Sequence, residues 1–207
     1  MTPALWRWPD RGRIKAYAEV VLKVGIVFVI FYGGANYLAN RSQNLFRFYF
    51  EWEQFIPFYP AFILAYLSLS ALTLCPLFLM SEAATRELGR QMILATVLAA
   101  TVFLIFPATT LWLRESDMAL VWRPLFEMIY LADHPFNTFP SLHVTYAGQT
   151  VLALWPTLGG GKRMFLSIWL ALICASVLLV RQHHVLDVVG GLGLAVLLKW
   201  KLKTKTV

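Results

Sequence analysis

The chain has 207 residues, of which 59% are hydrophobic and only 14% are charged, and its formal net charge is +7. Soluble domains carry about 25% charged residues, so this composition excludes an ordinary soluble protein. The positive charge is spread over several loops instead of gathering on one soluble face, which argues against nucleic acid as a partner.

Apolar runs recur along the whole chain. A bilayer core of about 30 Å takes about 20 helical residues to cross. These runs lack the period-two alternation of barrel strands, so each is predicted to be a helix. The sequence therefore predicts an all-α fold, a polytopic membrane protein in which residues 1–207 form a single integral membrane domain. It is expected to be a six-transmembrane-helix bundle with spans at 16–38, 55–80, 92–113, 141–158, 165–180 and 185–198.

The first apolar run follows a basic segment, as it would in a secretory signal peptide. Its apolar part exceeds the roughly 7 to 15 residues of a signal core, and no clear A-x-A cleavage site follows it. We therefore expect a span that is retained.

Lysines and arginines fall into two unequal sets on opposite sides of this predicted bundle. By the positive-inside rule, the larger set marks the cytoplasmic side, and both termini belong to it. The larger set is Arg7, Arg11, Arg13, Lys15, Arg86, Arg90, Lys162, Arg163, Lys199, Lys201, Lys203 and Lys205, and the smaller is Arg41, Arg47, Arg114, Arg123 and Arg181.

The longest connection, residues 114–139, carries aromatic side chains along its length. Such residues suit the boundary between water and lipid, so we expect one or two short interfacial helices here, with Pro124 in the first turn of one. Cys75 and Cys174 lie within apolar runs and are expected to be free thiols. The glycines of the last run are expected to allow close helix packing, at Gly190, Gly191 and Gly193.

Two polar stretches stand at the starts of apolar runs. "FPSLH" places His143 at the start of the fourth run, and "RQHHVLDVVGG" opens the sixth. His183 and Asp187 are four residues apart and so share a helix face. A carboxylate within an apolar run is costly and marks a functional site, for which His183 is the partner. Because the fourth and sixth spans begin at the same membrane surface, His143 can meet this pair.

The order and spacing of these residues resemble the type 2 phosphatidic acid phosphatase superfamily, whose members have six spans and the motifs K-x6-R-P, P-S-G-H and S-R-x5-H-x3-D. Here the motifs read Arg123-Pro124, Pro140 to His143, and His183 to Asp187, within residues 114–191.

Three positions depart from the motifs. Ser116 stands where the lysine is expected, with Arg114 nearby, Leu142 replaces the glycine, and Val177 replaces the arginine of the third motif. A basic residue appears instead at Arg181, and "RQHH" is similar to the branch of inositol-phosphorylceramide synthases and related transferases.

The resemblance implies a mechanism through a phosphohistidine. His183 would attack phosphorus, Asp187 would orient its ring, and His143 would protonate the leaving group and then activate water or an acceptor hydroxyl. The resemblance implies neither metal nor other cofactor. The substrate phosphate would be bound by Arg123, Ser141, Arg181 and Arg114.

The function implied is that of an integral membrane lipid phosphatase, cleaving a phosphomonoester or pyrophosphate of a membrane lipid at the outer face of a bacterial inner membrane. The same triad also serves a phospho-headgroup transferase. Other hypotheses are a transporter in which the histidines bind zinc or relay protons, and an inactive lipid-binding relative. His184 is expected to contact the site or a headgroup, and Asp133 and His134 to be solvated loop residues.

Overall fold

The computed structural model describes residues 8–42, 44–112, 114–115, 118–132 and 135–201. Within these residues every regular element is a helix, and β pairing is limited to isolated bridges. The first helical run joins α1 (Arg11–Val27), a π-helical segment (Phe28–Gly33) and α2 (Gly34–Ala39). The later elements are two 3-10 helices (Glu51–Phe55 and Pro60–Phe62), α3 (Ile63–Leu67), α4 (Leu69–Leu79), α5 (Glu82–Ile105), α6 (Arg123–Ala132), α7 (Leu142–Leu154), a 3-10 turn (Trp155–Thr157), α8 (Gly160–Leu179) and α9 (Val185–Lys201).

Each of the six predicted apolar runs contains a helix. Three helical segments of the described chain are long and apolar enough to cross a membrane, namely Pro60–Leu79, α5 and α8. The two cysteines are free, as predicted. Among its described residues, the connection before α7 contains one helix, α6, and Pro124 lies in the first turn of α6.

The largest difference in boundaries concerns the third run, which was predicted at 92–113. α5 already begins at Glu82, because the hydroxyl of Ser81 accepts a hydrogen bond from the amide of Ala84 and caps the helix. It ends at Ile105, shortly before Pro107, which has no amide hydrogen with which to continue a helix. Hydropathy therefore misses the polar start of this helix and extends past its end, because the sequence after Phe106 is still apolar.

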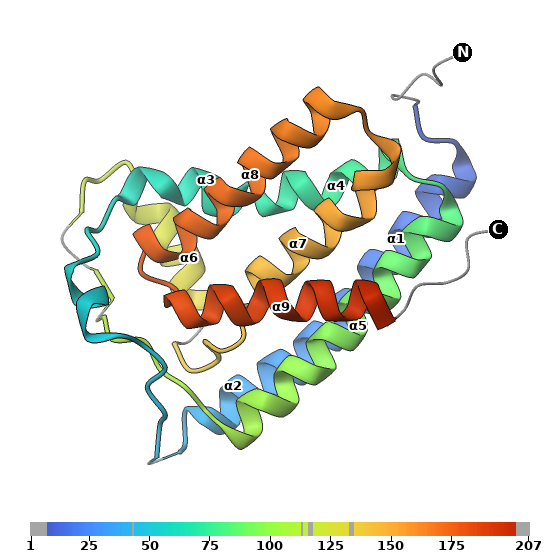
Figure 1. The fold of residues 1–207 in the computed structure, drawn as a ribbon. Coiled ribbons are helices and arrows are strands. Elements are labelled where there is room, and N and C mark those ends of the chain that lie inside the picture. The colour runs from blue at the N-terminus through green and yellow to red at the C-terminus, as the bar shows by residue number, and fades with distance from the viewer. Residues whose placement is uncertain (1–7, 43, 113, 116–117, 133–134, 202–207) are drawn as a thin grey trace.

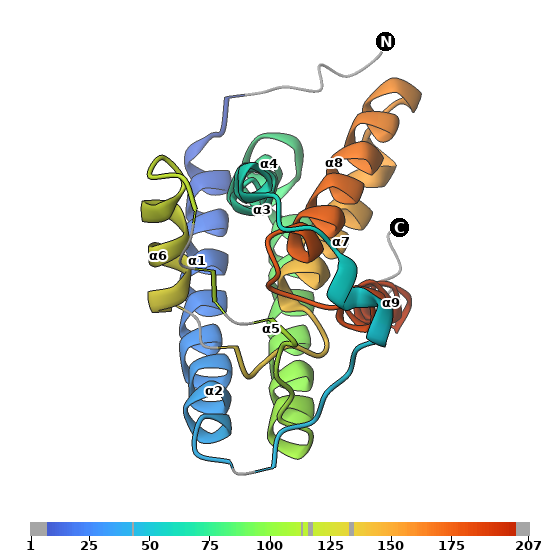
Figure 2. The same ribbon diagram turned by 90° about the vertical axis from the view of Figure 1, so that its left-hand side faces the viewer.

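The helices run back and forth between two ends of the molecule (Figure 1). The start of α1 and the end of α9 lie at one end, together with the α4–α5 and α7–α8 connections. The other end carries α6, the 3-10 helix Glu51–Phe55 and the α8–α9 turn, and it faces the viewer in Figure 2. There α6 lies crosswise to α4 and α9, which are seen end-on.

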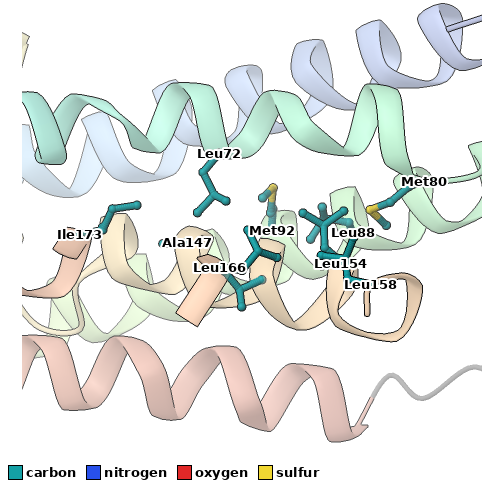
Figure 3. Close-up of a cluster of buried hydrophobic side chains, with 10 residues drawn as sticks. Leu72, Met80, Leu88, Met92, Ala147, Leu154, Leu158, Leu166 and Ile173 are labelled. Atoms are coloured by element: carbon teal, nitrogen blue, oxygen red, sulfur yellow. The ribbon is translucent and has the colours of Figure 1, made fainter. Parts of the chain in front are cut away.

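A cluster of buried apolar side chains joins α4, α5, α7 and α8 (Figure 3). Leu72 of α4, Leu88 and Met92 of α5, Leu154 of α7 and Ile173 of α8 belong to it. Between helices in lipid, contacts of this kind stabilise by close packing and not by removal from water. The cluster therefore fixes how the helices that carry the functional residues lie against one another.

α7 and α9 approach each other closely at Gly191. A β-carbon there would lie 2.6 Å from the backbone oxygen of Ser141 and 3.1 Å from Cβ of Val144. The hydroxyl of Thr145 reinforces the approach by donating to the backbone oxygen of Gly191 over 3.1 Å. Gly190 is equally crowded by Phe139, whereas nothing lies within 4 Å of the β-carbon position at Gly193, so the packing role predicted for Gly193 is wrong.

Gly191→Ala is expected to destabilise the protein, because its methyl group overlaps a backbone oxygen and neither helix can yield freely. Overpacking of this kind costs about 1 to 3 kcal/mol, which lowers Tm by about 2 to 12 °C. Thermal unfolding of the detergent-solubilised protein measures the change. Gly193→Ala is the matched control and is expected to leave Tm unchanged or slightly higher. An equal loss of Tm in both variants would contradict the close approach described here.

Candidate active site

Three connections meet at the end of the bundle shown in Figure 2. They are the segment after α5, the segment before α7 and the turn between α8 and α9. Backbone hydrogen bonds hold the first of them, since the Phe46 amide donates to Pro107 over 2.8 Å and the Thr109 amide donates to Phe46 over 3.0 Å. Ala108 then bridges to Asn137 in the second connection.

These connections enclose a small cavity, called here the His183 cavity, with a volume of about 20 Å³. Its wall combines a histidine, two arginines and several hydrogen-bonding groups. The lining residues are Thr110, Trp112, Arg114, Tyr130, Pro135, Asn137, Thr138, Arg181, Gln182 and His183.

His183 is held by acceptors on one side of its ring. Its Nδ1 lies 3.1 Å from the backbone oxygen of Thr138 and 3.4 Å from Oδ2 of Asp187. A carbonyl and a carboxylate can only accept, so Nδ1 carries the ring proton. In the neutral ring the lone pair is therefore on Nε2, the atom type that can act as a nucleophile.

Asp187 is fully buried in the first turn of α9. Its Oδ2 accepts a hydrogen bond of 2.8 Å from the amide of His184, the residue just before the helix. In a capping box the third helical residue makes the same bond back to the residue before the helix. The backbone oxygen of Asp187 accepts from the amide of Ser141 over 3.1 Å, which ties the start of α7 to α9. The structure thus brings His183 and Asp187 together as the sequence predicts.

His184 is buried in a site of its own. Its Nε2 accepts the amide hydrogen of Leu111 over 2.9 Å, so its Nδ1 carries the proton and donates to Oε2 of Glu53 over 2.9 Å. The ring is stacked on Trp112 at 4.3 Å between centroids and lies near Tyr49. Burial lowers the pKa of His184, although the hydrogen bond to Glu53 acts in the opposite direction. Burial therefore favours the neutral ring.

Arg181 forms the turn that ends α8. Its φ angle is +57°, in the left-handed region where glycine is usual and another residue costs about 1 to 2 kcal/mol. The Gln182 amide donates to Val177 and the Arg181 amide to Leu178, each over 3.0 Å, which is the Schellman pattern. An arginine at a glycine position indicates that its side chain is needed there.

The guanidinium of Arg181 reaches into the His183 cavity. It forms an ion pair with Glu115 and donates to the backbone oxygen of Ile56 over 3.2 Å. Within the described part of the chain, its Nε and the indole Nε1 of Trp112 are buried donors without an acceptor. Two such donors in one cavity wall favour an anionic ligand.

The other two predicted arginines lie along a second cavity of about 420 Å³, called here the Arg123 cavity. Arg123 lines this cavity and not the His183 cavity, whereas Arg114 and Tyr130 line both. Arg114 donates to the backbone oxygen of Tyr130 over 2.7 Å and stacks over that ring. Glu115 and Glu127 add negative charge to the Arg123 cavity.

Ser141 and His143 stand at the start of α7. Ser141 is fully buried, and its hydroxyl accepts from the amide of Val144 over 3.3 Å, so it caps the helix and does not line the cavity. Nε2 of His143 lies 2.9 Å from the backbone oxygen of Tyr66, and the rings of His143 and Tyr66 stack with 4.0 Å between their centroids. His143 is not among the residues that line the His183 cavity.

Sequence reasoning missed three residues of this site. Glu53 lies outside the motif region, and Glu115 is adjacent to Ser116 without being part of a motif, so nothing local distinguishes either from a solvated glutamate. Thr138 contributes only its backbone oxygen, for which no side-chain pattern exists. Ser116, Asp133 and His134 lie outside the described residues, and among the described residues no three His, Cys, Asp or Glu side chains form a metal-binding group.

A family model described as PAP2 superfamily matches residues 56–200, well over half of the chain. No curated protein and no solved structure gives a match. The matched region extends from just before α3 to the last turn of α9 and includes His143, His183 and Asp187. Membership of this family supports a phosphatase-type, membrane-associated enzyme. On this match the chain belongs to the PAP2 superfamily.

Proposed function

We propose that the protein is a lipid phosphatase of the membrane that cleaves a phosphomonoester or pyrophosphate through a phosphohistidine on His183. The observation that carries the proposal is the tautomer of His183. Acceptors occupy its Nδ1 side, and its Nε2 remains available beside Arg181 and Arg114. Cations around a phosphoryl group and an aligned nucleophile are the main requirements of phosphoryl transfer.

In the first step Nε2 of His183 bonds to phosphorus while the bond from phosphorus to the lipid oxygen breaks. Asp187 stabilises the positive charge that develops on the ring. The leaving oxygen takes a proton from His143. Because Nε2 of His143 faces the backbone oxygen of Tyr66, the proton that is transferred sits on Nδ1.

In the second step a water molecule attacks the phosphohistidine. His143, now neutral, takes a proton from this water, and the bond between nitrogen and phosphorus breaks to release inorganic phosphate and free His183. No step of this scheme calls for a metal or another cofactor.

The proposed topology has six spans with both termini in the cytoplasm and the site at the outer face of a bacterial inner membrane. Two features support it. The start of α1 and the end of α9 lie at the same end of the bundle, as an even number of crossings requires (Figure 1). The described members of the larger basic set lie in the early turns of α1, α5 and α8 and in the last turn of α9, which are at that same end. α6 then lies along the outer surface.

A phospho-headgroup transferase is the second candidate function, and the Arg123 cavity favours it. This cavity shares Arg114 and Tyr130 with the His183 cavity and, at about 420 Å³, is far larger. Its two carboxylates can accept hydrogen bonds from an alcohol. An acceptor hydroxyl held there would replace water in the second step.

His183→Ala is expected to abolish phosphate release, because the first covalent bond cannot form. The fall is expected to be at least about 1000-fold in kcat. The measurement is the release of inorganic phosphate from phosphatidic acid, phosphatidylglycerophosphate, an isoprenyl pyrophosphate and a lipid A phosphate in detergent micelles. Adding glycerol or inositol as acceptor and identifying the lipid products separates hydrolysis from transfer. Equal phosphate release by the alanine variant would rule out the proposed mechanism.

Glu115→Gln is expected to lower KM by roughly three- to tenfold, equivalent to about 1 kcal/mol of competing interaction. Glu115 forms an ion pair with Arg181, so the phosphate of the substrate has to compete with this carboxylate for the guanidinium. The inhibition constant of orthovanadate should fall by the same factor.

Glu127→Gln is the control, because this exposed glutamate lines the same Arg123 cavity as Glu115, whereas the ion pair of Arg181 is with Glu115. A rise of KM in Glu115→Gln would show that the carboxylate orients Arg181 for the substrate instead of competing with it.

A further inference from the structure

Glu53 is an ionisable residue that the proposed mechanism does not use, although it is 0% exposed. It lies in the 3-10 helix Glu51–Phe55, in the connection between α2 and α3. Its Oε1 accepts from the amide of Phe50 over 3.0 Å. Its Oε2 accepts from Nδ1 of His184 over 2.9 Å and from the amide of Val185 over 3.0 Å.

The ring of His184 requires an acceptor at this place. Its Nε2 is already committed as an acceptor by the amide of Leu111, so a neutral ring must carry its hydrogen on Nδ1. A buried donor without a partner is costly, and a carboxylate oxygen meets the need most strongly. Glu53 therefore fixes both the tautomer and the orientation of His184.

His184 in turn sets the environment of the nucleophile. Its amide donates to Oδ2 of Asp187 over 2.8 Å, and the same oxygen lies 3.4 Å from Nδ1 of His183. His184 is also bonded directly to His183 through the backbone. A displacement of His184 thus moves the carboxylate and the nucleophile together.

A helix cap alone does not account for Glu53. One hydrogen bond from a side chain to the amide of Val185 is enough for a cap, and α9 already has Asp187 in that role. The burial of a glutamate against a histidine ring, between segments that are 131 residues apart, adds a costly feature that capping does not require.

We infer that Glu53 is a positioning residue, which acts through His184 to hold Asp187 and His183 in the geometry for attack on phosphorus. This inference rests on the proposed function. Glu53 itself touches neither substrate nor reacting atoms in this scheme. Its removal should slow the formation of the phosphohistidine without changing how tightly the substrate binds.

Glu53→Gln is the decisive variant, since it keeps the size of the side chain and removes one acceptor. Phe50 and His184 donate to different oxygens, so an amide must place its NH₂ group against one of these donors. Glu51→Gln is the matched control, because Glu51 is exposed in the same 3-10 helix.

The experiment is rapid quench with a lipid of the panel above that carries radiolabelled phosphate, followed by detection of base-stable, acid-labile label on the protein. In Glu53→Gln the rate constant of labelling is expected to fall about 10- to 100-fold. The burst amplitude, which counts active molecules, and KM should stay within about twofold of the unmodified protein. Glu51→Gln should match the unmodified protein in all three quantities.

Two results would overturn the inference. One is an unchanged rate constant with full amplitude. The other is a loss of amplitude with an unchanged rate constant, which is what a purely structural role produces. Absence of label on the unmodified protein, or unchanged labelling in His183→Ala, would instead refute the proposed function, so the two failures are distinguishable.

A second pair of variants decides the question if Glu53→Gln does not fold. His184→Asn places an amide nitrogen near the position of Nδ1 and keeps the bond to Glu53, whereas His184→Gln places one near Nε2 and loses it. The inference requires faster labelling in His184→Asn than in His184→Gln. Equal rate constants, or the opposite order, would overturn it.

Discussion

The site depends on one buried carboxylate, that of Asp187, at the beginning of α9. Its Oδ2 accepts the amide of His184 and faces Nδ1 of His183, while its backbone oxygen receives the amide of Ser141 at the start of α7. A negative charge is stable there because the free amides and the dipole of a helix N-terminus favour it. The same residue therefore joins the two helices and, in the proposed mechanism, orients the nucleophile.

Around this carboxylate, the end of the bundle that carries the candidate site is held together by polar contacts between segments that are distant in sequence. Glu53 accepts a hydrogen bond from His184, Glu115 forms an ion pair with Arg181, and the amide of Leu111 donates to the ring of His184. Apolar packing fixes the helices elsewhere, as the cluster in Figure 3 illustrates. This division follows from the charged residues at this end, because charges placed in low dielectric need defined partners.

Local patterns in the sequence predicted much of this arrangement. Hydropathy located a helix in each of six runs, and the spacing of four residues suggested that Asp187 lies beside His183. The two do lie together, but α9 begins only at Val185, so they meet across the helix start and do not share a helix face. The helix limits of α5 were missed because Ser81 caps the helix in polar sequence before the apolar run, whereas Pro107 follows the end of the helix while the apolar run continues.

Partnerships across long sequence separations could not be predicted. The burial of Glu53 depends on a loop folding over the start of α9, and the separation of Arg123 from the His183 cavity depends on where α6 lies. Ser141 was predicted to bind phosphate, yet the local rule that a serine at a helix start caps the helix describes its position better.

The left-handed turn at Arg181 couples two parts of the chemistry. Only Gln182 separates this cation from His183, and the amides of Gln182 and His183 both donate to the backbone oxygen of Val177. The guanidinium of Arg181 and the ring of His183, the proposed nucleophile, are thus both carried by the short hydrogen-bonded turn at the end of α8. In the proposed mechanism one short backbone segment therefore positions both the cation and the nucleophile, so a change in this turn would displace the two together.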